Sequence, residues 1–183
     1  MRRISILAFC LVILPIILSG CVQPEKRGSV VIERNRFYRC ESAAAIEKKM
    51  VKLINQARFR KRYCGDRPCS PVRSIKWNEK LARAALMHSK DMATNDFFSH
   101  RGSEGSLTKN RVNQNRYSWG VLGENIYAGS ETSEGVVEGW LESADHCENI
   151  MTAEFTEIGA ACYRNPSSKY GTYWTLVLAS PLR

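Results

Sequence analysis

The sequence lacks an apolar run long enough to cross a bilayer as a helix. Its longest run, Ile4 to Leu18, has 15 residues and is interrupted by Pro15, whereas a spanning helix needs about 20 apolar residues. Two arginines precede this run, and small residues follow it before Cys21. This order is typical of a cleaved signal peptide, so residues 1 to 20 are predicted to be a signal and not a membrane span.

The end of the signal, Leu18-Ser19-Gly20-Cys21, resembles a bacterial lipobox, in which the cysteine thiol takes a diacylglyceryl group. The alternative is an ordinary signal peptide that is cut elsewhere and leaves Cys21 as a plain thiol. Several acyl chains on one residue would supply the two or more membrane signals that stable anchoring requires. We therefore expect an extracytoplasmic protein, anchored by lipid to the cell membrane or the outer membrane.

Acidic residues are the scarcer charged class, with 18 Asp and Glu against 27 Lys and Arg and a net charge of +9. Removal of the signal leaves 163 residues, enough for one domain with a real core, and a net charge of +7. An exported basic surface meets phospholipid head groups and acidic wall polymers before nucleic acid, and a solvated helix end without a partner is the alternative. Few aromatic residues interleave with the basic run, so nucleic-acid binding is not expected. The run consists of Arg58, Arg60, Lys61, Arg62 and Arg67.

Cys-x-x-Cys pairs are absent, which argues against the common cysteine-rich zinc sites. Export permits disulfides, and an odd number of cysteines in the mature chain leaves one free or paired between molecules. Spacing alone does not give the connectivity. We favour Cys147 with Cys162, which would tie a helix end to a strand, and Cys64 with Cys69, and the pairing of Cys64 with Cys147 is a serious rival. The mature chain, apart from Cys21, contains Cys40, Cys64, Cys69, Cys147 and Cys162.

Residues that break or cap regular structure, together with the periodicity of apolar residues, divide the rest of the chain into a tether, helices and strands. Residues 21 to 41 are predicted to be the lipidated cysteine and a tether, in which Val30 to Ile32 could pack as a short strand. Residues 42 to 183 are predicted to form one domain. Both faces of its last strand are largely apolar, which favours an α/β/α sandwich of the α+β class with a small antiparallel sheet. The expected helices cover about 43 to 61, from 78 onward, 106 to 112 and from 133 onward, and the expected strands cover 121 to 128, 158 to 164 and 172 to 179.

Several short motifs occur in one order between residues 46 and 181. Together they resemble the bacterial branch of the CAP family, the group of SCP, cysteine-rich secretory and pathogenesis-related-1 proteins, and any one of them alone is a weak signal. The motifs are Asn55-Gln56-Ala57-Arg58, Trp77-Asn78-Glu79-Lys80-Leu81, the stretch from His88 to His100, Gly123-Glu124-Asn125-Ile126, Gly139-Trp140, His146 with Asn149-Ile150-Met151, Phe155 to Gly159, and Tyr173-Trp174-Thr175.

The resemblance implies a surface cleft lined by two histidines and two glutamates. His100, Glu124 and His146 match the first three of these positions. The family pattern places the second glutamate where this chain has Ser143. Glu142 is the substitute that we expect, because it would face His146 at i, i+4 if one helix continued through both residues.

Imidazoles beside a carboxylate suit zinc or a similar divalent cation, and they can also carry a proton. His88 lies on an apolar helical stripe and is expected to be structural. No nucleophile triad is evident.

The favoured function is a membrane-anchored binding module without catalysis, which takes a lipid-like or envelope ligand. The alternatives are a metal-dependent hydrolase acting on peptide or cell wall, and a structural envelope protein that binds acidic polymers.

Overall fold

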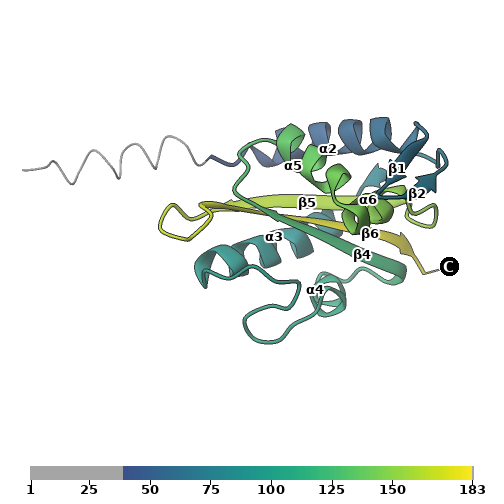
Figure 1. Ribbon diagram of the computed structural model, residues 1–183. Helices are drawn as coiled ribbons and strands as arrows, with labels where there is room; N and C mark the ends of the chain where they lie inside the picture. Colours follow the sequence, from purple (N-terminus) through teal and green to yellow (C-terminus); the bar gives the residue numbers. More distant parts are fainter. Residues whose placement is uncertain (1–38, 183) are drawn as a thin grey trace, which may run out of the picture.

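The computed structural model describes residues 39 to 182. The predicted signal, Cys21 and the possible strand from Val30 to Ile32 lie outside the described residues. A four-stranded sheet lies between two layers of helices (Figure 1). One layer contains α2 (Ala43–Arg58), α5 (Ser133–Glu142) and α6 (Ala144–Met151), and the other contains α3 (Glu79–Thr94) and α4 (Thr108–Gln114). Within residues 39 to 182, no helix is long and apolar enough to span a membrane.

The sheet confirms the predicted α/β/α arrangement. Its order is β3-β5-β6-β4, in which β6 pairs antiparallel with both β5 and β4, while the two-residue β3 pairs parallel with β5. A separate hairpin joins β1 and β2. The strands are β1 (Arg62–Cys64), β2 (Arg67–Cys69), β3 (Lys76–Trp77), β4 (Trp119–Ala128), β5 (Glu157–Arg164) and β6 (Thr172–Pro181).

Strand β6 is buried on both faces, as its sequence predicted. Alternate side chains point to opposite faces of a strand. Trp174, Leu176 and Leu178 pack in the cluster formed with α2, α5 and α6, whereas Val177 and Ala179 pack in the cluster formed with α3 and α4. The core is therefore two apolar layers that share one central strand.

The helix starts agree with the sequence better than the helix ends do. Ser42 caps α2 by accepting a hydrogen bond from the amide of Ala45, and Asn78 caps α3 in the same way through Lys80. The predicted extension of α2 to residue 61 is wrong, because the helix ends at Arg58 and the hairpin follows. The cap of α5 is Thr132 and not Ser133.

Two disulfides join Cys40 to Cys162 and Cys64 to Cys147, and Cys69 is free. The favoured pairings, Cys147 with Cys162 and Cys64 with Cys69, are wrong, and the rival pairing of Cys64 with Cys147 is the one found. Cys162 points from β5 toward the start of α2, whereas Cys147 packs on the hairpin, so they belong to separate clusters.

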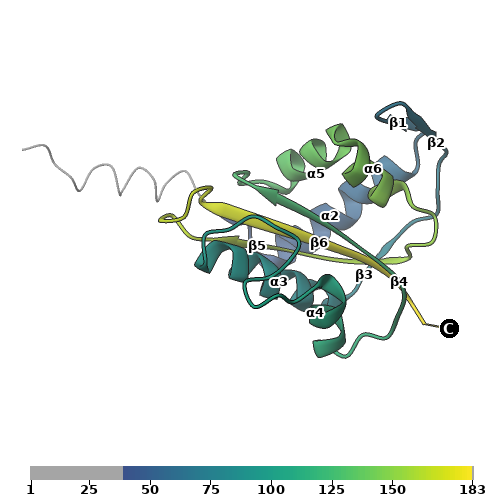
Figure 2. The same cartoon turned by 60° about the horizontal axis from the view of Figure 1, so that its bottom comes forward.

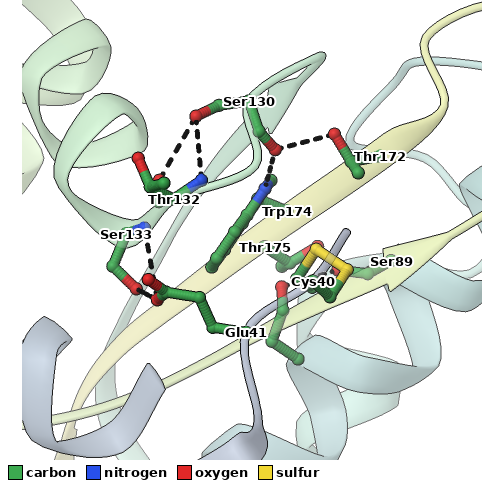
Figure 3. Close-up of a disulfide and its surroundings, with 11 residues drawn as sticks. Cys40, Glu41, Ser89, Ser130, Thr132, Ser133, Thr172, Trp174 and Thr175 are labelled. Carbon is green, nitrogen blue, oxygen red and sulfur yellow. Dashed lines mark hydrogen bonds between the residues drawn. A yellow bond between two sulfur atoms is a disulfide. The ribbon is translucent and has the colours of Figure 1, made fainter. Parts of the chain in front are cut away.

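Figure 3 shows the first disulfide beside the entry to α2. Next to Cys40, the carboxylate of Glu41 accepts hydrogen bonds from the amide and hydroxyl of Ser133 and pairs with Lys49. The Ser133 hydroxyl is engaged there, which explains why Thr132 caps α5 instead. These contacts fix the start of the domain to both β5 and α5.

Candidate functional site

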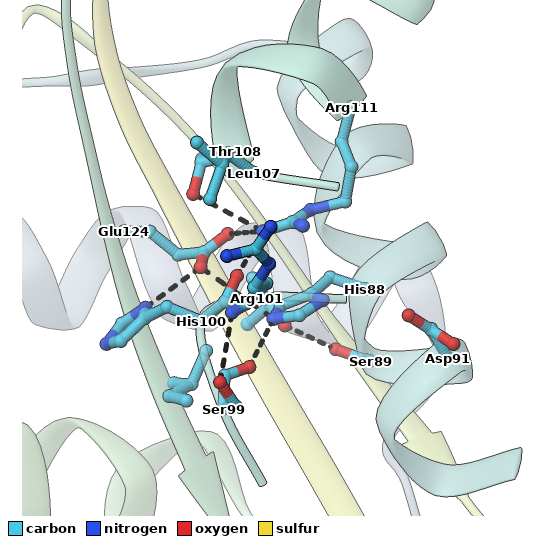
Figure 4. Close-up of polar contacts among 12 residues, drawn as sticks. His88, Ser89, Asp91, Ser99, His100, Arg101, Leu107, Thr108, Arg111 and Glu124 are labelled. Carbon is cyan, nitrogen blue, oxygen red and sulfur yellow. Dashed lines mark hydrogen bonds and ion pairs between the residues drawn. The ribbon is translucent and has the colours of Figure 1, made fainter. Parts of the chain in front are cut away.

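A polar centre lies at the β4 edge of the sheet, on the side of α3 and α4 (Figure 4). Glu124 projects from β4, His100 comes from the loop after α3, and Arg111 comes from α4. The Nδ1 atom of His100 lies 2.9 Å from Oε1 of Glu124, and Nη2 of Arg111 lies 2.7 Å from Oε2. Each carboxylate oxygen therefore has a charged or polar partner.

Glu124 is held as a buried carboxylate. Its side chain is 3% exposed, against 55% for His100. Burial raises the pKa of Glu124, but the hydrogen bond from His100 and the charge of Arg111 outweigh it, so the pKa lies below its usual value. Because Glu124 accepts at Nδ1–H, the Nε2 atom of the exposed His100 ring is left to face solvent.

Arg111 organises the loop as well as the carboxylate. Its guanidinium donates to the carbonyl oxygens of His100, at 3.2 Å, and Ser106, at 3.0 Å. The side chain is 4% exposed. Arg111 therefore fixes both the charge of Glu124 and the backbone that carries His100. The sequence motifs gave Arg111 no role, and no spacing rule marks an arginine in a seven-residue helix as part of a site.

His88 lies beneath this centre and is fully buried. Its Nε2 is 2.9 Å from the carbonyl oxygen of Ser99 and 3.8 Å from Oε1 of Glu124, while Nδ1 has no hydrogen-bond partner within residues 39 to 182. Burial lowers the pKa of His88. A neutral ring that donates from Nε2 to a carbonyl is a structural group, in line with the expectation from its apolar stripe.

His146 approaches the centre from α6. Its carbonyl oxygen accepts a hydrogen bond of 3.0 Å from Asn125 on β4, and Asn149 donates in turn to the side-chain oxygen of Asn125 at 2.9 Å. Burial lowers the pKa of His146, and the charge of nearby His100 lowers it further. The two imidazoles therefore lie close enough to influence each other. Within the described residues, no group of three or more His, Cys, Asp and Glu side chains is placed to hold a metal ion.

The reason for expecting Glu142 at the centre is wrong. Ser143 has an extended backbone, with φ −91° and ψ 124°, and separates α5 from α6. Glu142 and His146 are thus not one turn apart on a single helix. Glu142 instead lines a hollow between α2 and α5, together with Arg60 and Arg62.

An apolar groove of about 340 Å³ lies at the other edge of the sheet. It opens between α2 and α3, where β5 extends beyond the short β3. Glu41, Glu47, Glu79 and Arg83 are its charged residues. The apolar lining includes Ile46, Trp77, Ala82, Leu86, Ala160 and Cys162. The sheet order places this groove and Glu124 on opposite edges of the molecule.

The basic run does not form one exposed surface. Arg58 is fully buried and donates to four carbonyl oxygens, whereas Arg67 pairs with Glu148 at 2.7 Å. Arg60 and Arg62 line the hollow that contains three glutamates of α5. The carbonyls around Arg58 belong to Arg73, Ile150, Thr152 and Phe155, at 2.7 to 3.0 Å.

These features are those of a CAP domain, and the chain belongs to the cysteine-rich secretory protein family, CAP, whose model matches residues 51 to 178. The chain is 31% identical to the uncharacterized protein YkwD of Bacillus subtilis over 134 residues, which is 73% of this chain and 47% of YkwD. It is 30% identical to the uncharacterized membrane protein YlbC of the same organism over 90 residues, 49% of this chain and 26% of YlbC. The chain thus spans less than half the length of these relatives.

Solved structures share the fold. An extracellular SCP-domain protein of Bacillus anthracis has a TM-score of 0.62 at 24% identity, covering 75% of this chain and 41% of that one. An outer surface protein of Borrelia burgdorferi has the same TM-score at 15% identity, covering 78% and 97%. NaASP2, solved with Zn²⁺, has a TM-score of 0.50 at 13% identity, covering 76% and 83%.

Proposed function

We propose that this chain is an extracytoplasmic CAP-domain lipoprotein that binds a lipid-like or envelope ligand without catalysis. The observation that carries the proposal is the state of Glu124, whose two oxygens are taken by His100 and Arg111 in a buried setting. A general base needs an oxygen that can reach a water or substrate proton. Both oxygens of Glu124 are already engaged and its side chain is 3% exposed, and no nucleophile contacts His100 among the described residues.

The groove between α2 and α3 is the place that best fits a lipid-like ligand. Small-molecule sites are concave and mostly apolar, with few polar groups. The alanines, Trp77 and Leu86 give this groove that character, and its three glutamates disfavour an anionic head group deep inside. An uncharged or acyl portion in the groove is therefore the expected mode of binding.

Metal-dependent hydrolysis is the second candidate, and the orientation of His100 supports it. A carboxylate that holds the inner nitrogen of an imidazole commonly orients a metal-ligating histidine. His100 and His146 could then take zinc or a similar cation weakly through their remaining nitrogens, as NaASP2 was solved with Zn²⁺. The charge of Arg111 counts against this role, because it neutralises Glu124 next to the site.

A titration with a fluorescent C16 fatty acid tests the groove. Leu86→Asp should weaken binding at least tenfold, because it puts a carboxylate on an apolar wall beside existing glutamates. Leu107→Asp is a matched control, since Leu107 is 43% exposed and Leu86 44%, and Leu107 does not line the groove. Equal affinity of Leu86→Asp and the unmutated chain would contradict binding there.

Zinc titration of the same protein preparation tests whether His100 and His146 bind metal. Replacing both His100 and His146 by Ala should abolish any heat of zinc binding at neutral pH and leave fatty-acid binding unchanged. Cleavage of peptides, esters or wall fragments that depends on added zinc and on both histidines would favour the hydrolase and contradict a non-catalytic module.

Cys21→Ala tests the anchor. We expect this variant to lose acylation by mass spectrometry and to move from the membrane fraction to a soluble or slowly processed form, because the thiol is the acceptor of the lipid. Cys69→Ser, which removes the free thiol of the domain and leaves the lipobox intact, should stay with the membrane. Detergent partitioning of Cys21→Ala identical to that of the unmutated protein would rule out a lipid anchor at this residue.

A further inference from the structure

Three of the five cysteines within residues 39 to 182 gather at one place, outside both the polar centre and the groove. The Cys64–Cys147 disulfide joins the β1–β2 hairpin to α6 and forms a buried cluster with Met151. The free Cys69 packs against this cluster. A thiol is therefore held beside a disulfide in the same chain.

The hairpin register puts Cys69 on the side where Cys64 lies. Arg62 pairs with Cys69, and Cys64 pairs with Arg67, across antiparallel strands. Directly paired residues, and residues two apart on one strand, share a face of the hairpin. Cys64 and Cys69 are thus diagonal neighbours on the face that packs against α6.

The surroundings of Cys69 also suit a reactive thiol. It is partly exposed, so solvent can remove its proton, whereas Cys64 and Cys147 are buried. Arg62 lies directly opposite it in the register, and reactive cysteines in proteins typically lie in partly exposed, electropositive surroundings. The hairpin has only three residues in each strand and projects at the rim of the molecule beside α6 (Figure 2).

We propose that Cys69, Cys64 and Cys147 form an intramolecular thiol–disulfide exchange site. The Cys69 thiolate attacks the sulfur of Cys64, a Cys64–Cys69 bond forms within the hairpin, and the bond to Cys147 breaks. Cys147 leaves as a thiolate and takes up a proton. One disulfide and one thiol are present before and after, so no external oxidant or reductant is consumed.

Exchange changes how α6 is held. The released Cys147 follows His146 directly, and the bond to Cys64 is the covalent tie of α6 to the hairpin. After exchange, α6 keeps its noncovalent contacts, including the Asn125 hydrogen bond to the carbonyl of His146. The exchange therefore loosens the helix that presents His146. This consequence for the ligand rests on the proposed function, but the exchange itself does not.

Peptide mapping of the full protein from its native envelope tests the site. Samples held without added reductant at pH 8 or pH 5 are quenched with acid, alkylated and mapped by mass spectrometry. We expect the Cys64–Cys69 peptide to accumulate at pH 8 by first-order kinetics that do not depend on protein concentration, and to be at least tenfold slower at pH 5, where thiolate is scarce. The Cys40–Cys162 bond should stay intact throughout.

Variants separate exchange from other thiol chemistry. Cys69→Ser should abolish the new peptide while keeping Cys64–Cys147, and Arg62→Gln should slow its formation several-fold, whereas Arg60→Gln should not. A persistent Cys64–Cys147 bond with free Cys69 at pH 8 would overturn the proposal, and so would a Cys69–Cys147 bond or a concentration-dependent Cys69–Cys69 dimer. These results would leave fatty-acid and zinc binding, and hence the proposed function, untouched.

Discussion

Two buried arginines show how differently one residue type can act in this domain. Arg111 pairs with the carboxylate of Glu124, whereas Arg58 has no acidic partner within residues 39 to 182 and donates to four main-chain carbonyl oxygens. Burial lowers the pKa of Arg58, yet a guanidinium stays charged in proteins. Arg58 therefore ties the end of α2 to the segments around residues 73 and 150 to 155.

Replacement of Arg58 by Met should destabilise the domain strongly. The apolar side chain fills much of the same volume but leaves several buried carbonyls without donors, each at a cost of roughly 1–3 kcal/mol. We expect a total loss of at least about 3 kcal/mol in the free energy of unfolding by urea denaturation. Arg60→Met is the control, and its exposed position predicts a change within about 0.5 kcal/mol. Equal losses for the two variants would show that the carbonyl network contributes little.

At the scale of single elements, the sequence predicted the features that depend on neighbouring residues, namely helix starts and the burial of a strand. Ser42 and Asn78 are good caps, and the alternating residues of β6 identify a strand buried on both faces. The predicted end of α2, residue 61, lies three residues beyond the observed end at Arg58. The side chain of Arg58 is buried because it donates to carbonyl oxygens far along the chain. No local rule contains that tertiary contact.

The disulfides illustrate the same limit. Spacing carries no information about which cysteines meet, so the favoured pairings failed and Cys40 was not considered as a partner of Cys162, which lies 122 residues away. The break between α5 and α6 at Ser143 likewise made the expected position of Glu142 wrong. The expected i, i+4 pair with His146 required one helix, and the backbone forms two.

At the scale of the molecule, the polar centre combines elements that are distant in sequence. The loop after α3 and strand β4 bring His100 and Glu124 into contact at one edge of the sheet, and the backbone of His146 on α6 is bonded to the next residue of β4, Asn125. In the sequence, only the family resemblance grouped these three residues. Arg111 and the structural role of Asn125 could not be predicted in this way. The groove at the opposite edge exists because β3 ends after two residues, which is a property of the assembled sheet.

The whole domain should lose stability as the pH falls through the histidine range. Burial lowers the pKa values of His88 and His146, so the unfolded chain binds protons near pH 6.5 that the folded chain refuses. A state that binds more protons is favoured by acid, and the free energy of unfolding therefore decreases below about pH 7, by at most about 1.4 kcal/mol per pH unit for each histidine. Glu124 adds a further loss below its usual range, because its folded pKa is also lowered.

Thermal melting from pH 8 to pH 4 measures this dependence. The melting temperature should be highest above pH 7, fall between pH 6.5 and 5, and fall again as the carboxylates protonate. His88→Gln should lower the melting temperature at pH 8, since it disturbs a buried position, but should flatten the slope between pH 6.5 and 5, because the glutamine does not titrate. His146→Gln should flatten the same interval with a smaller cost at pH 8, since its side chain is only partly buried. A melting temperature that stays constant or rises between pH 7 and 5 would mean that both imidazoles accept protons in the folded domain, and the neutral state assigned to His88 would then be wrong.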